Sequence, residues 1–141
     1  MLALNYLTAT QLRISMRCRA ALIETLRRLE TGVIARNDFK MDSLKCCFYG
    51  HAQSVDPGCM PPVDHLYGGL LNLCFPFDCA LAFNANRSQG AHALRNYLVA
   101  GRADWPAVMR TPRDPVAAGE WRVSIESDAL TVMPAHALEA A

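Results

Sequence analysis

Residues 8–31 read "TATQLRISMRCRAALIETLRRLET" and form the clearest structural signal in the chain. At about 100° per residue, apolar side chains fall on one face and arginines, interrupted by one glutamate, fall opposite. The apolar face holds Ile14, Cys18, Ala21, Leu22, Leu26 and Leu29. Thr8 or Thr10 can cap the start, and Gly32 can supply the left-handed residue after the end. The stretch predicts one amphipathic helix whose buried face includes Cys18.

The composition predicts one soluble, cytoplasmic domain. The chain has 141 residues, of which 52% are hydrophobic, and a formal net charge of +1. That length suits a single domain with a core, and that charge argues against a dedicated nucleic-acid-binding protein. No apolar run reaches the about 18–20 residues that a membrane span needs. The N-terminus does not have the pattern of a secretory signal.

Further helices are expected along the chain after this first one. A short helix runs through 44–52, where Gly50 suggests that another backbone comes close. A second is expected over 63–74, and residues 75–86 are ambiguous between strand and helix. A last helix, capped by Asn86 or Ser88, ends at Gly101.

The C-terminal part predicts strands. The stretch "EWRVSIE" at 120–126 alternates apolar and polar residues, and "ALTVM" at 129–133 can pair with it. The expected fold class is therefore α+β, a mainly helical single domain over 1–141 with a C-terminal β-hairpin. Its helical part covers about 8–109 and its hairpin about 119–134.

The stretch "CCFYGH" at 46–51 raises the question of a metal site. Cys47 and His51 would share one helix face, and Cys59 with His65 could complete a tetrahedral zinc site. The chain has no C-x-x-C motif, which is the strong signal for zinc. The alternative is that Cys46 or Cys47 packs in the core and His51 bonds to a backbone carbonyl. No cofactor is expected, with zinc as the alternative.

A cysteine nucleophile is a second possibility. The stretch "FDCALAF" at 77–83 resembles the D-C-S-G-L-V segment of cell-wall cysteine peptidases of the papain-like class, without its Ser-Gly. Cys79 or Cys47 would be the nucleophile, with His51 or His65 as the base in a permuted order. The sequence favours a non-enzymatic protein over this hydrolase.

A binding surface is the third possibility. Arg13, Arg17, Arg27 and Arg28 share one face of the first helix, and a solvated face explains them better than contact with phosphates. Aromatic residues and arginines are favoured at interface hot spots. The aromatic candidates are Tyr49, Tyr67 and Trp105.

The order of these landmarks resembles a group of small uncharacterised proteins of phages, prophages and mobile elements. Their pattern has an F-D-M element, then C-G-T-x-x-C-I-A-G-H-A, then L-F-x-P-x-D and a closing helix. The similarity spans about residues 12–106. Asp42-Ser43-Leu44 stand in place of C-G-T. The matching residues are Phe39 and Met41, then Cys47, Gly50, His51 and Ala52, then Phe75, Pro76 and Asp78.

The resemblance implies that the chain shares the fold of this group and has a phage-like or bacterial origin. It does not imply any activity. We therefore expect a small binding or regulatory protein that occludes a host macromolecule, such as an inhibitor of a host defence system of the anti-CRISPR kind. Its partner would be a host protein or a protein–nucleic acid complex, without direct nucleic-acid binding and without a membrane. The alternatives are the permuted papain-like cysteine hydrolase and a small structural zinc-binding domain.

Overall fold

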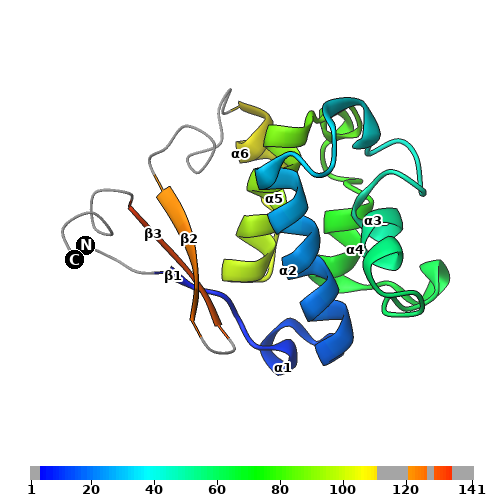
Figure 1. Ribbon diagram of the computed structural model, residues 1–141. Helices are drawn as coiled ribbons and strands as arrows, with labels where there is room; N and C mark the ends of the chain where they lie inside the picture. The colour runs from blue at the N-terminus through cyan, green and yellow to red at the C-terminus, as the bar shows by residue number, and fades with distance from the viewer. Residues whose placement is uncertain (1–3, 111–120, 127–128, 135–141) are drawn as a thin grey trace.

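The computed structural model describes the backbone of residues 4–110, 121–126 and 129–134, and the side chains of residues 6–110 (Figure 1). The α-helices are α1 (Ala9–Leu12), α2 (Met16–Thr31), α3 (Phe48–Val55), α4 (Gly68–Cys74), α5 (Arg87–Ala100) and α6 (Trp105–Arg110). Three 3-10 turns lie between them, η1 (Arg36–Asp38), η2 (Val63–His65) and η3 (Ala80–Asn84). The strands are β1 (Leu4–Asn5), β2 (Trp121–Glu126) and β3 (Ala129–Pro134).

The first helical stretch is broken into two helices. Thr8 caps α1 by accepting the backbone N–H of Gln11, and Gly32 ends α2 in the left-handed region at φ 82°. These two cap predictions are confirmed. The prediction of one continuous helix is wrong, because Arg13 adopts φ 58° and ends α1. Ser15 then caps a new helix by accepting the N–H of Cys18, so a second cap inside the stretch competes with helix continuation.

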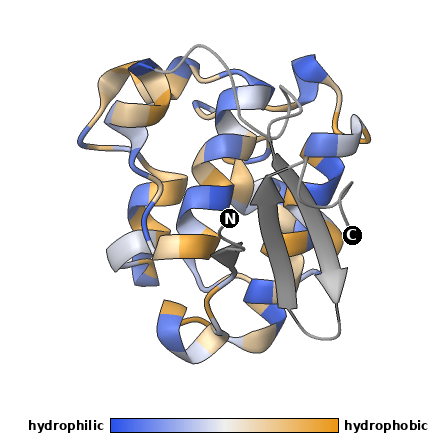
Figure 2. Cartoon of the chain, turned by 90° about the vertical axis from the view of Figure 1, so that its left-hand side faces the viewer, coloured by the Kyte–Doolittle hydropathy of each residue, from blue (hydrophilic) through white to orange (hydrophobic). Residues whose placement is uncertain are grey.

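The core lies around the contact between α2 and α5, which lie side by side in Figure 1. Helix α2 buries the predicted apolar face from Cys18 to Leu29. Figure 2 shows the resulting bands of hydrophobic and hydrophilic residues along the helices. A buried ion pair joins the two central helices, with Arg95 Nη2 2.9 Å from Glu30 Oε1. The prediction of a helix capped by Asn86 and closed by Gly101 is confirmed in α5.

Three glycines allow close backbone or ring contacts between segments. A Cβ on Gly50 would meet the carbonyl of Lys45, which confirms the predicted close approach at this residue. A Cβ on Gly69 would meet the carbonyl oxygen of Gly101, and one on Gly90 would meet the ring of Phe39. Each glycine therefore sets how closely its helix packs.

The fold-class prediction, an α+β domain closed by a C-terminal β-hairpin, is wrong for the body formed by residues 6–110. Helix makes up 63% of this region, and none of its residues lies in a strand. Its buried apolar side chains come from the helices and from the loops that join them. In the backbone outside this body, β2 and β1 both pair antiparallel with β3, giving the order β1-β3-β2. The two stretches with alternating residues pair with each other as β2 and β3, whereas the sequence did not indicate that β1 would pair with the other edge of β3.

Candidate binding pocket

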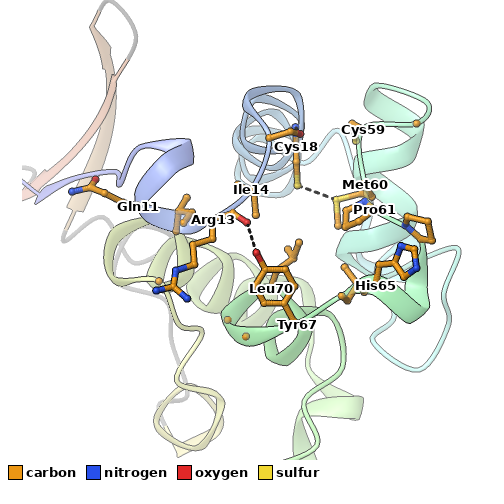
Figure 3. Close-up of a pocket in the computed structure, with 18 residues that line it drawn as sticks. Gln11, Arg13, Ile14, Cys18, Cys59, Met60, Pro61, His65, Tyr67 and Leu70 are labelled. Carbon is orange, nitrogen blue, oxygen red and sulfur yellow. Dashed lines mark hydrogen bonds between the residues drawn. The ribbon is translucent and has the colours of Figure 1, made fainter.

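A cavity of about 750 Å³ lies where the corner between α1 and α2 faces the segment from Gly58 to Leu70 (Figure 3). Its deep wall is apolar and largely buried, with Leu12, Met60 and Leu70 each at 8% exposure or less. The exposed polar residues of its lining are Gln11, Arg13, Ser15, His65 and Tyr67. The pocket therefore has an apolar interior and a partly polar rim.

The left-handed turn at Arg13 builds one side of this pocket. The Arg13 N–H donates to the carbonyl oxygens of Ala9 and Thr10, so these two carbonyls have a hydrogen-bond partner where α1 ends. The Tyr67 hydroxyl donates to the Arg13 carbonyl oxygen at 3.2 Å, across the lower side of the cavity in Figure 3. A left-handed conformation in a residue with a side chain costs about 1–2 kcal/mol. The bonds on both sides of Arg13 hold it in this conformation.

The opposite side of the pocket is a loop fixed by polar contacts. Arg17 holds Asp56 with two hydrogen bonds, of 2.9 Å from Nε and 2.7 Å from Nη2. The same Nη2 donates to the Pro57 carbonyl oxygen, and the Tyr49 hydroxyl donates to that of Pro61 at 2.8 Å. The hydrogen bond from Arg17 lowers the pKa of Asp56 below its usual value. These contacts form the wall before any ligand arrives.

Sulfur atoms form the top of the cavity. The Cys18 thiol donates to the Met60 sulfur at 3.4 Å, and the Cys59 thiol donates to the Ala52 carbonyl oxygen at 3.3 Å. Burial, together with the nearby Cys59, raises the pKa of Cys18 to about 12. Burial also raises the pKa of Cys59. Cys18, with its pKa of about 12, is a protonated thiol at neutral pH.

The structure separates the residues proposed as zinc ligands. Cys59 and His65 line the pocket, whereas Cys47 is buried at the start of α3. His51 Nε2 lies 2.7 Å from the Asp38 carbonyl oxygen. Within residues 6–110, no group of three His, Cys, Asp or Glu side chains is placed to hold a metal ion. The placements of Cys47 and His51 agree with the alternative interpretation, core packing and a backbone hydrogen bond.

The residues proposed for a cysteine hydrolase do not form a nucleophile–base pair in the part of the chain whose side chains are described. Burial raises the pKa of the Cys47 thiol, which weakens it as a nucleophile. The His51 ring is already bonded to Asp38. Cys79 is half-buried at the start of η3, and His65 lies on the rim of the pocket. No hydrogen bond joins Cys79 to either histidine.

The residues proposed for a binding surface fall into different environments. Arg27 and Arg28 both pair with Glu24, and Arg17 pairs with Asp56. Tyr67 is 59% exposed at the pocket, together with Arg13.

Tyr49 is half-buried and supports the loop through its hydroxyl. Trp105 is fully buried, and its indole N–H donates to the Asn72 carbonyl oxygen at 3.0 Å. The expectation that Trp105 is a surface anchor is therefore corrected, because its side chain belongs to the core.

Met60 and Leu70 are among the pocket residues that the sequence did not indicate. Neither was singled out, because each is one apolar residue in a loop or a short helix. The prolines and glycine around Met60 did indicate a loop. No local pattern indicated that this loop would face the start of α2.

Comparisons with protein families, with curated proteins and with solved structures found no match to this chain. Among the helices that the structure describes, none has both the length and the apolar character needed to cross a membrane.

Proposed function

We propose that this is a binding protein that receives an apolar group of a partner in the pocket between the α1–α2 corner and residues 58–70. The observation that carries the proposal is the preformed cavity of about 750 Å³ with its apolar interior. Pockets that bind small molecules or anchoring groups are about 300–1,000 Å³ and mostly apolar. The proposed partner is a host protein or a protein–nucleic acid complex in the cytoplasm, which this protein would occlude.

Hydrogen bonds within the two walls support this mode of binding. The Arg17–Asp56 and Tyr67–Arg13 contacts hold the two sides in place, so little ordering is left for the moment of binding. An aromatic anchor that buries about 150–250 Å² gains about 4–6 kcal/mol of gross transfer free energy at about 25 cal/mol per Å², from which the cost of association is subtracted. One anchoring side chain is therefore enough for an interface hot spot.

The cysteine hydrolase has weaker support than binding. A nucleophilic cysteine needs a lowered pKa and a base within hydrogen-bond reach. The Cys47 thiol has a raised pKa, and His51 bonds to a backbone carbonyl. The arrangement of these residues favours packing over catalysis.

A neutral fluorescent dye tests the pocket. N-phenyl-1-naphthylamine should bind the folded protein saturably at one site and fluoresce more strongly. Ile14 points into the cavity in Figure 3. The Ile14→Trp variant should therefore fill the cavity and lower the affinity for the dye at least tenfold. The matched control is Leu81→Trp, at a residue that is 67% exposed on η3. Equal affinity in both variants, or no saturable binding by the wild type, would refute the pocket.

The same variants test the macromolecular partner. A photo-crosslinking amino acid at Tyr67 should capture a specific host protein in cells, and one at Leu81 should not. The capture at position 67 should disappear when Ile14→Trp is added. A crosslink that persists in the filled variant would show that the partner binds outside the pocket.

A further inference from the structure

Two sulfur atoms meet at the top of the pocket without a carboxylate beside them. Cys18 Sγ lies 3.4 Å from Met60 Sδ, from two segments that are far apart in the sequence (Figure 3). Both residues line the cavity, and none of the residues that line it is Asp or Glu. A third sulfur, that of Cys59, belongs to the same lining.

This donor set has a definite chemical preference. A thiolate and a thioether are soft ligands, which favour Cu(I) over ions that require oxygen. Magnesium and calcium ions need carboxylate and carbonyl oxygens in larger number. The Cys18–Met60 pair therefore selects by chemistry for a soft ion.

We propose that Cys18 and Met60 bind one soft monovalent metal ion of the Cu(I) class, which reaches them through the pocket. With metal–sulfur bonds of about 2.3 Å, as in zinc thiolates, sulfurs 3.4 Å apart subtend an angle of about 95° at the ion. Met60 can widen this angle, because its unbranched side chain has three rotatable bonds. A third coordination position would face the cavity.

Binding exchanges a proton for the ion and leaves the oxidation state unchanged. The Cys18 S–H bond breaks, a Cys18 S–metal bond forms, and one proton leaves to the solvent. Because the pKa of Cys18 is about 12, the proton competes with the ion at neutral pH. Below that pKa, the affinity should therefore rise about tenfold for each unit by which the pH is raised. This site does not depend on the proposed partner.

An anaerobic titration with Cu(I) tests the site. Reduced wild-type protein should withdraw one equivalent of Cu(I) from its coloured complex with bicinchoninate. Cys18→Ala should withdraw none at the same concentration, and Met60→Leu, which keeps the side-chain volume, should bind at least tenfold more weakly. The matched control is Cys79→Ser, a half-buried cysteine outside this lining, which should behave as the wild type.

The folding of each variant is checked by its circular dichroism and melting temperature. If Cys18→Ala fails to fold, Met60→Leu and the pH dependence of the wild type decide the result. The site is overturned if the wild type takes up no Cu(I). It is also overturned if a folded Cys18→Ala or Met60→Leu variant binds as tightly as the wild type.

Discussion

Replacing Gly50 by alanine should destabilise the protein, although alanine is the better helix former. Inside α3 the exchange alone would gain about 1 kcal/mol. The new Cβ would however overlap the Lys45 carbonyl, with the Leu44 carbonyl oxygen also 2.5 Å away. Overpacking costs about 1–3 kcal/mol, and a backbone obstacle places this case at the upper end. The net loss should be about 2 kcal/mol, which lowers the melting temperature by about 6 °C.

Urea unfolding followed by circular dichroism measures this difference directly. The matched control is Ser54→Ala, on the exposed side of the same helix, which should gain a few tenths of a kcal/mol. If Gly50→Ala is as stable as the wild type or more stable, helix propensity outweighs the contact. The close packing of α3 on residues 44–45 would then be wrong.

Glu30→Ala should lower the free energy of unfolding by about 3 kcal/mol in urea, because the buried Arg95 loses its carboxylate partner. The hydrogen bond from Arg27 lowers the pKa of Glu24. The stability that this pairing gives the folded protein is therefore fully present above about pH 4.3, and it is lost as the pH falls through the lowered pKa of Glu24. The urea midpoint of the wild type should therefore fall more steeply between pH 5 and pH 3 than that of Glu24→Gln; parallel curves would contradict this. Iodoacetamide should label the half-buried thiols in the native state well before the buried ones, as peptide mass spectrometry can show. The half-buried thiols are Cys46 and Cys79.

Local signals in the sequence predicted the ends of helices and one close contact. Thr8, Asn86, Gly32 and Gly101 occupy the caps that their side chains or φ angles favour. Gly50 was expected at a close backbone approach and lies at one. These features depend on a few neighbouring residues, so they can be inferred without the tertiary structure.

Features set by distant residues were not predictable in the same way. Arg13 has no intrinsic preference for a left-handed φ, and the Tyr67 hydroxyl that bonds its carbonyl comes from a different element. Trp105 was expected on the surface because tryptophan is common in interfaces, but the core offers its N–H the Asn72 carbonyl. The pocket likewise exists only because the loop at Met60 lies against Cys18.

The close contacts at Gly50, Gly69 and Gly90 also provide a way to recognise distant relatives. Each position faces backbone or an aromatic ring where a Cβ would collide, so a protein that keeps these helix contacts should keep glycine there. At Gly50 the closest contacts are with backbone atoms of Lys45, so the Lys45 side chain is free to vary. Gly101, which faces Gly69, should itself stay glycine because its φ of 83° lies in the left-handed region. A search of genomes for this spacing of glycines, combined with the capping residues of α2 and α5, could identify proteins that share these helix contacts even when their overall sequence identity to this chain is low.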